Sequence, residues 1–176
     1  PPGSEVSKGQ IEFPLERRHM NAAANNAITY REATTADIPA LAELRWEMEV
    51  ERHGARFSLA VYTAAFDRAM RADMERGSFR AWVAEADGAL VACVVLLWSP
   101  FPPHFEQFGR KRGFVSSVYT RPEFRRRGIG RTLMRMLMDT SREIGVTRLV
   151  LWASDMGRPL YEELGFAPSR AMEFNF

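Results

Sequence analysis

The sequence predicts a single domain of mixed α and β structure, and three observations carry this prediction. Segments in which apolar residues alternate with polar ones, typical of strands, are interspersed with segments whose apolar residues recur every three or four positions, typical of helices. The dipeptide Asp87-Gly88 separates two apolar runs and is a strong signal for a two-residue hairpin. No internal repeat and no linker rich in Pro, Gly and Ser divides the chain after residue 27. We therefore expect one α+β domain over residues 27–176.

The order of the elements follows from local propensity and turn signals. Helices are expected from Thr35 or Asp37 to about Glu51, and over 59–76, 128–143 and 157–164. Strands are expected at 28–31, 79–86, 90–98, 114–120 and 147–153, with final extended pieces at 166 and 171–176. The connection 99–113, rich in proline and aromatic residues, is predicted to be a long loop.

The composition is that of a globular protein. Of 176 residues, 46% are hydrophobic and 26% are charged, which excludes a disordered chain, a collagen and a coiled coil. The net charge of +2 is small for a protein that binds nucleic acid, and the longest apolar run, 90–98, is too short for a membrane helix. The single cysteine, Cys93, excludes an internal disulfide, so a reducing, cytoplasmic setting is expected.

The first residues are expected to lie outside the domain. The chain begins with Pro1 rather than Met, and His19-Met20 resembles a cloning junction. We interpret residues 1–19 as a leader that is left from cloning or is disordered, with native N-terminal sequence as the alternative.

The clearest chemical signal is a basic loop that precedes a helix. A strand ends at Arg121-Pro122, and Gly128 and Gly130 then open a long amphipathic helix. The unpaired N–H groups and the dipole of a helix start favour an anion, and glycine lets the backbone approach a phosphate closely. Positive charge comes from Arg125, Arg126, Arg127 and Arg131. The pattern is neither a Walker A loop nor a Rossmann fingerprint, and a solvated basic turn is the alternative interpretation.

Two segments together resemble the GNAT superfamily of acyl-CoA N-acyltransferases. Arg125-x-x-Gly128-x-Gly130 is similar to the pyrophosphate loop of that superfamily, Gln/Arg-x-x-Gly-x-Gly/Ala. The run from Leu160 to Phe166 is similar to its helix end, Leu-Tyr-x-x-Leu-Gly-Phe. The resemblance covers roughly residues 27–176 and implies a splayed, mostly antiparallel, seven-stranded sheet flanked by about four helices.

The resemblance also implies a site for acetyl-CoA, the cosubstrate, in the V between the strands at 114–120 and 147–153. The pantetheine arm would pair with the backbone at Val118 and Thr120, and the acyl carbonyl would face backbone donors near Val118. The pyrophosphate would lie on the N–H groups from Arg126 to Arg131. The implied set is Val118, Tyr119, Thr120, Arg125, Arg126, Arg127, Gly128, Ile129, Gly130, Arg131 and Thr132, with no metal.

Tyr161 is the candidate general acid, because the resemblance places its hydroxyl beside the CoA sulfur. The alternative is an aromatic side chain that only packs between Leu160 and Leu164. The general base is left open. Its candidates are Glu47, Glu49, Glu51, His53 and Glu173, and the residues of the first helix are also explained as a solvated charged face. Ser116 and Ser117 could hold a water near the reaction centre, or simply face the core. Cys93 lies in an apolar strand and is expected to be a buried hydrophobe, so we expect direct transfer in a ternary complex.

The expected activity is acetyl transfer to the primary amine of a small molecule or an amino-acid-like metabolite. The alternatives are a protein or peptide N-acetyltransferase and a non-catalytic acyl-CoA sensor on the same fold. The loop 99–113 is a candidate wall for the acceptor, through Phe101, His104, Phe105, Phe108 and the basic run Arg110-Lys111-Arg112. Partners among nucleic acids or membranes are not expected, and the oligomeric state is left open, with a homodimer among the options.

Overall fold

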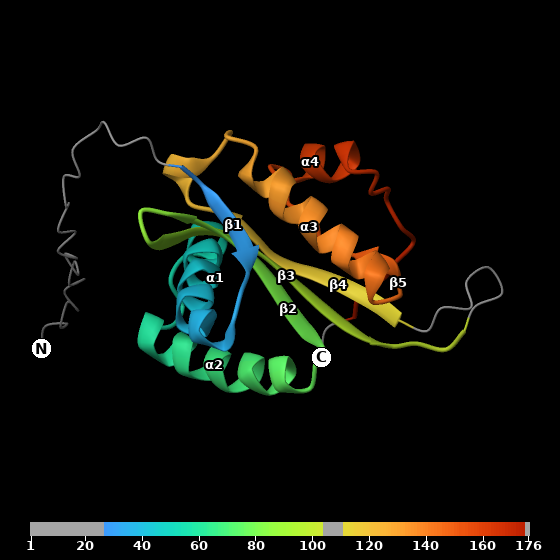
Figure 1. The fold of residues 1–176 in the computed structure, drawn as a ribbon, viewed down its shortest axis with the longest axis horizontal. Helices are drawn as coiled ribbons and strands as arrows, with labels where there is room; N and C mark the ends of the chain where they lie inside the picture. Colours follow the sequence, from blue (N-terminus) through green and yellow to red (C-terminus); the bar gives the residue numbers. More distant parts are fainter. Residues whose placement is uncertain (1–26, 104–110, 175–176) are drawn as a thin grey trace, which may run out of the picture.

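A computed structural model describes residues 27–103 and 111–174 (Figure 1). Its strands are β1 (Thr29–Glu32), β2 (Phe79–Ala86), β3 (Ala89–Pro100), β4 (Lys111–Thr120) and β5 (Val146–Val150). Its α-helices are α1 (Ile38–His53), α2 (Leu59–Glu75), α3 (Ile129–Glu143) and α4 (Arg158–Glu163), and short 3-10 helices lie at Thr35–Asp37 and Pro122–Phe124. The expected leader at 1–19 lies outside the described residues.

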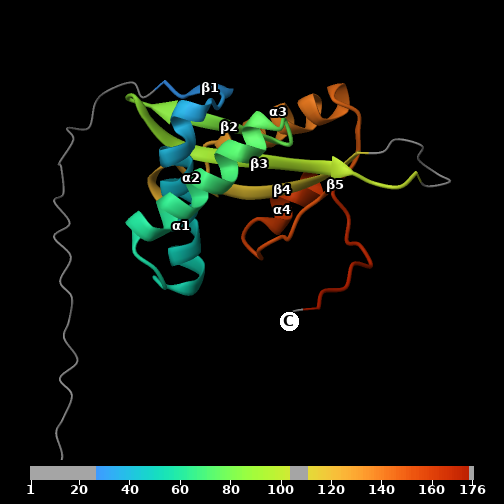
Figure 2. The same cartoon turned by 90° about the horizontal axis from the view of Figure 1, so that it is seen from below.

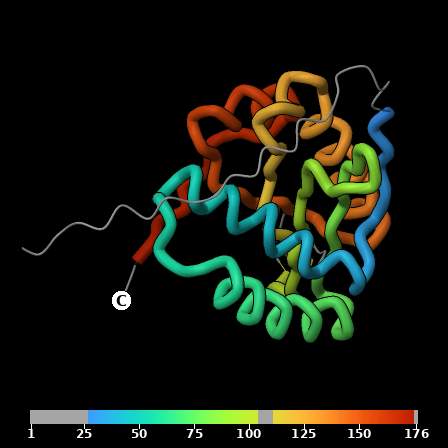
Figure 3. Tube along the Cα trace, turned by 90° about the vertical axis from the view of Figure 1, so that its left-hand side faces the viewer, coloured from blue at the N-terminus to red at the C-terminus, as the bar shows by residue number. Residues whose placement is uncertain are grey.

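The strands form one sheet in the order β1-β2-β3-β4-β5, antiparallel from β1 to β4, with β5 parallel to β4. Helices α1 and α2 cover one face, and α3 covers the other, as the end-on view separates them (Figure 3). One core packs Leu133, Met134 and Leu137 of α3 against the sheet, and the second packs Leu41 and Leu44 of α1 against the opposite face. The central strands are therefore buried on both faces, which explains their nearly continuous apolar sequence.

The predicted helices and the predicted hairpin are confirmed. Each of the four expected helices is present, with ends that differ by a few residues from the expectation. Asp87 and Gly88 both have positive φ, 51° and 74°, as a type I′ turn between two antiparallel strands requires. The preference of this dipeptide for a type I′ turn was therefore sufficient to predict the hairpin between β2 and β3.

The prediction of seven strands was wrong: the described residues contain five. Strand β5 ends at Val150 rather than at 153, and residues 166–174 pair with no strand. Figure 2 shows this last segment running away from the sheet. Pro168 has no N–H to give to a ladder, and it stands between α4 and the expected final piece at 171–176. Within the described residues that piece is extended but is not a strand of the sheet.

Some of the predicted loop 99–113 is strand. Ser99 pairs with Arg112 and Pro100 with Lys111, so β3 and β4 stay paired beyond Leu97, where β2 ends opposite β3. The guanidinium of Arg112 lies 4.5 Å from the centre of the Phe101 ring. His104, Phe105, Phe108 and Arg110 lie outside the described residues.

Strands β4 and β5 pair only at one end. Their register runs from Lys111 opposite Val146 to Phe114 opposite Val150, and β4 continues alone from Val115 to Thr120 on that edge. The paired end is closely packed at Gly113, where a Cβ atom would lie 2.6 Å from Leu149 Cδ2 and 3.0 Å from Val146 Cγ1. The two strands are therefore in close contact at Gly113 and separate after Phe114; we call this point of separation the fork. Among the described residues, no helix is long and apolar enough to cross a membrane.

We expect Gly113→Ala to destabilise the fold by about 1–3 kcal/mol, because the added methyl group overpacks the contact between β4 and β5. Urea denaturation measures this change in the free energy of unfolding. The matched control is Gly130→Ala, since a Cβ at Gly130 meets only Leu160 Cδ2, at an ordinary 3.5 Å. Equal stability of the two variants would contradict the close approach at Gly113.

Candidate active site

A cavity lies at the fork where β4 leaves β5. Its walls come from α1, from β4 between Phe114 and Tyr119, from the segment after β5, and from Tyr161 of α4. The rings of Phe114 and Trp152 meet edge to face at the base of the fork, with their centres 4.3 Å apart. Several predicted site residues that are distant in sequence, Val118, Tyr119, Arg125 and Tyr161, thus line one cavity.

Strand β4 is distorted beside this cavity. Cys93 and Val95 of β3 are two residues apart, but their partners Tyr119 and Ser116 are three apart, so β4 contains a bulge. Within it, Ser117 has a φ of 49°, in the left-handed region that costs a non-glycine residue of order 1–3 kcal/mol. Val118, the expected donor to the acyl carbonyl, follows this strained residue directly. The backbone geometry at Val118 therefore depends on what holds Ser117 in place.

The phenol of Tyr161 is almost completely buried, with 7% of the residue exposed, and it lines the cavity. Its ring packs edge to face against Phe166, with the centres 6.0 Å apart. Burial raises the pKa of Tyr161, and the opposing effect of the Arg52 charge is smaller. The hydroxyl therefore stays protonated at neutral pH and can donate a hydrogen bond. The packing role and the cavity-facing role, which the sequence left as alternatives, coexist in one side chain.

The loop from β4 to α3 presents backbone rather than side chains. Arg126 and Gly128 both have positive φ, 63° and 78°, and Gly128 is the N-terminal cap of α3. The first N–H groups of α3 have no acceptor within the helix. A Cβ on Gly128 would meet nothing within 4 Å, so the glycine is needed for its conformation rather than for space inside the protein. The start of α3 therefore has the backbone geometry that an anion site at a helix start requires.

Three of the four arginines around this loop are engaged by the protein. Arg125 binds Glu51 of α1 through two hydrogen bonds of 2.9 and 2.5 Å, and its Nε donates to the Thr120 carbonyl at 2.8 Å. Arg127 donates to the Glu123 carbonyl at 2.9 Å, and Arg131 pairs with Glu163 at 2.6 Å. Of these four, only Arg126 has no such partner within the described residues. Most of the positive charge around the start of α3 is therefore already paired within the protein.

A row of glutamates on α1 ties the helix to this loop. Glu43 and Glu47 lie 3.5 and 2.8 Å from Arg121, and Glu51 holds Arg125 one turn further on. The Arg125 hydrogen bond lowers the pKa of Glu51. Of the carboxylates proposed as bases, Glu47 and Glu51 are thus already paired with Arg121 and Arg125 of the loop.

The other candidate bases differ in their surroundings. Glu49 lines the cavity, 3.1 Å from Arg45 and 3.8 Å from the His53 ring. Glu173 lies exposed in the extended segment after α4. Cys93 is fully buried, which raises its pKa to about 12, and its thiol donates to the Ser117 carbonyl at 3.2 Å. The expectation that Cys93 is buried in an apolar strand is confirmed.

Sequence reasoning assigned no site role to nine residues of the cavity, among them Arg45, Arg52, Trp152 and Met156. Arg45 and Arg52 read as solvated charges on a helix, and the spacing of Arg45 and Glu49 indicates only an ion pair along that helix. Trp152 was predicted to lie within a strand. No local pattern marks any of these positions, because they meet the site only through the packing of α1 and the early end of β5.

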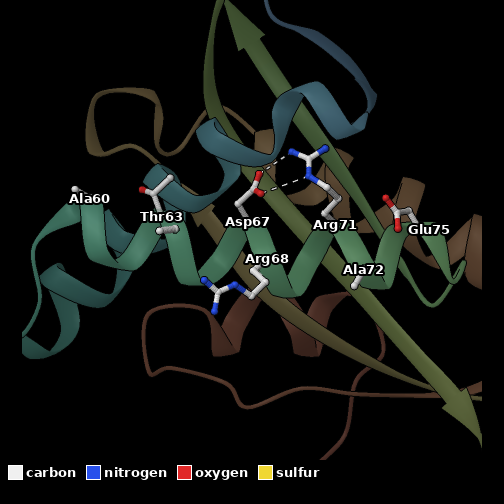
Figure 4. A pocket seen from close by; sticks show the side chains of 8 residues that line it. Ala60, Thr63, Asp67, Arg68, Arg71, Ala72 and Glu75 are labelled. Atoms are coloured by element: carbon white, nitrogen blue, oxygen red, sulfur yellow. Dashed lines mark hydrogen bonds and ion pairs between the residues drawn. The ribbon is translucent and has the colours of Figure 1, made fainter.

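A second hollow lies along the outer face of α2 (Figure 4). All eight of its residues come from this one helix, and its ion pair, Asp67 with Arg71, is an ordinary pair one turn apart. Groups from separate elements do not converge there, so we assign it no chemistry.

The comparisons with known proteins agree with this geometry. A profile of the acetyltransferase (GNAT) family matches residues 38–166, and the chain belongs to that family. Among solved structures, a GCN5-related N-acetyltransferase from Ralstonia eutropha JMP134 is 30% identical, with a TM-score of 0.76 over 85% of this chain and 99% of its own. A predicted acetyltransferase of Clostridium acetobutylicum, crystallised with acetyl-CoA, is 24% identical, with a TM-score of 0.75 over 85% of this chain and 96% of its own.

A curated relative is the glucosamine 6-phosphate N-acetyltransferase of Trypanosoma brucei brucei. It is 36% identical over 64 residues, which is 36% of this chain and 44% of the relative. The match therefore spans less than half of that enzyme.

We expect Gly130→Val to weaken CoA binding at least tenfold, because a branched side chain would stand where the anion meets the start of α3. Isothermal titration calorimetry with CoA measures the affinity. Gly130→Ala is the control: the family pattern accepts alanine here and the protein has room for a methyl group, so its affinity should stay near wild type. Unchanged affinity in a folded Gly130→Val variant would place the phosphates elsewhere.

Proposed function

We propose that this protein is an N-acetyltransferase that transfers an acetyl group from acetyl-CoA to a primary amine by direct attack. One observation carries the proposal. The buried phenol of Tyr161 and the open, bulged edge of β4 line a single cavity, and β4 leads from it to the anion site at the start of α3. An acyl-CoA thioester needs a proton donor near its sulfur, a free strand edge for its pantetheine arm and a site for its phosphates, and these three features would supply them.

The residues present fit acetyl-CoA along its length. Beyond Phe114 the backbone of β4 has no strand on its β5 side and offers hydrogen-bonding groups to an extended pantetheine arm. The first N–H groups of α3 favour the pyrophosphate. The backbone at Val118 would donate to the thioester carbonyl, and Tyr161 would face the sulfur. Charge development on the carbonyl oxygen would thus meet preorganised donors.

The transfer needs a neutral amine, a polarised carbonyl and a leaving thiolate. The amine nitrogen attacks the carbonyl carbon, the carbon–sulfur bond breaks, and the thiolate takes the phenolic proton of Tyr161, while the amine releases its proton to water. An alkylamine of pKa about 10.4 is neutral in only about one molecule in 2,500 at pH 7. A base that reaches the amine directly or through water is therefore useful, and Glu49 is the carboxylate in the cavity that is not held by a loop arginine.

The acceptor that we favour is a small amine or an amino-acid-like metabolite. An amino sugar phosphate is the second candidate, favoured by the similarity to the Trypanosoma brucei brucei enzyme. Arg52, which lines the cavity, has no carboxylate partner within the described residues and is placed to meet a negative group of such an acceptor. A protein terminus and a non-catalytic acyl-CoA sensor are the remaining alternatives.

A turnover screen tests this function. Purified protein with acetyl-CoA should release free thiol with at least one member of a panel of alkylamines, amino acids, aminoglycosides and glucosamine 6-phosphate. A peptide with a free N-terminus belongs in the same panel, to separate a small-molecule enzyme from a protein acetyltransferase. Tight CoA binding without turnover across the panel would contradict an enzyme and favour a sensor.

We expect Tyr161→Phe to lower kcat by roughly 10²-fold, the low end for a positioned proton donor, because the CoA thiolate is a tolerable leaving group by itself. The ring and its packing are kept, so CoA affinity should hardly change. Steady-state kinetics with two different amines should show the same loss, since the thiolate is common to both. Wild-type turnover under conditions where chemistry limits the rate would leave Tyr161 only a packing role.

A further inference from the structure

The guanidinium of Arg45 joins three elements beside the cavity. Its Nη1 donates to Ser116 Oγ at 2.7 Å and to Ser117 Oγ at 2.9 Å, both on β4. Its Nε donates to the hydroxyl of Tyr62 on α2 at 3.1 Å, and its Nη2 lies 3.1 Å from Glu49 on its own helix. Because Arg45 stands on α1, this one side chain connects both helices of that face to the strand that borders the cavity.

The two serine contacts depend on the bulge. Consecutive side chains of a regular strand point to opposite faces of a sheet, and one nitrogen atom would not reach both. The extra residue in β4 brings both hydroxyls to the same side, where Ser117 is buried with 6% exposed. The Ser117 carbonyl is held as well, by the Cys93 thiol at 3.2 Å. Arg45 therefore stabilises the residue whose φ of 49° is costly for a side chain other than glycine.

We propose that Arg45 is a positioning residue that holds the bulge of β4 and thereby aims the backbone donor at Val118 toward the acyl carbonyl. This inference rests on the proposed acetyl transfer and adds to it a residue outside the two sequence motifs. Arg45 acts through Ser116 and Ser117 and does not touch the reacting atoms.

The hydrogen bonds separate this role from acceptor binding. A guanidinium has five N–H donors; three of those of Arg45 are used by Tyr62 and the two serines, and its Nη2 forms an ion pair with Glu49. The charge of Arg45 is moreover balanced by Glu49, so little is left for an anionic acceptor. A lysine in its place has one nitrogen and cannot bridge two serines and Tyr62 together.

The first experiment compares Arg45→Met with Arg68→Met, a control on the exposed face of α2 (Figure 4). We expect Arg45→Met to lower kcat about 10- to 100-fold, somewhat less than the removal of an oxyanion donor, with CoA affinity unchanged. Arg45→Lys should be intermediate, and Arg68→Met should match wild type. A wild-type kcat in folded Arg45→Met, or a rise in the acceptor KM alone, would overturn the proposal.

The second measurement reports on the carbonyl itself. Isotope-edited infrared spectroscopy of bound acetyl-CoA labelled with ¹³C at the carbonyl should show a stretch shifted from that of free acetyl-CoA, as a hydrogen-bonded carbonyl requires. We expect most of this shift to be lost in Arg45→Met and kept in Arg68→Met. A loss of kcat without a change in the stretch would assign Arg45 a different role.

A second variant keeps the test decisive if Arg45→Met fails to fold. The double variant Ser116→Ala/Ser117→Ala removes both contacts to β4 and leaves the bonds of Arg45 to α1 and α2. It should reproduce the lost stretch shift and lower kcat about 10- to 100-fold, because it removes the same two contacts between Arg45 and β4. A wild-type stretch in the double variant would overturn the proposal. The spectra need no acceptor, so a wild type that turns over no amine would contradict the proposed function alone.

Discussion

The structure depends on the separation of β4 from β5. The two strands need close contact at Gly113, where only a hydrogen atom fits between the backbone and Leu149, and they need to separate immediately after Phe114. A regular parallel pair would continue and close the cavity. The early end of β5 and the contact of Trp152 with Phe114 hold the fork open. The cavity, the free edge of β4 and the position of Tyr161 all follow from this local loss of strand pairing.

Most of the charged side chains around the fork form salt bridges with one another. Glutamates of α1 hold Arg121 and Arg125, Glu163 holds Arg131, and Glu49 faces Arg45. Ion pairs of this exposure contribute little to stability one by one. Their effect is to fix the orientation of the loop and of α1 relative to β4. The backbone N–H groups at the start of α3 and the side chains of Arg52 and Arg126 stand outside these pairs. The N–H groups have fixed directions and need little rearrangement when a ligand arrives.

The sequence predicted those features whose physical cause is local. The Asp87-Gly88 turn and the four helices each depend on a few neighbouring residues, and each was found where it was expected. Gly128 caps α3 as the sequence predicts, and the anion site at that helix start stays a prediction. The seven-stranded sheet was implied by the family resemblance, and residues 171–176 were expected only as a final extended piece, with no partner strand specified. Alternation shows which face of a segment is apolar, but pairing also needs a free edge within reach and backbone N–H groups along the whole segment.

By itself the sequence determined the family, the anion loop and the likeness of Tyr161 to a catalytic acid, because the residues of each motif lie within one turn or one helix. The tertiary structure alone decided how the charged residues are used. It committed Glu47 and Glu51 to loop arginines and brought Arg45 to two serines that lie 71 and 72 positions further along the chain. Those contacts exist because α1 crosses β4 at its bulge. Such a crossing is set by the packing of whole elements and leaves no pattern in the sequence around Arg45.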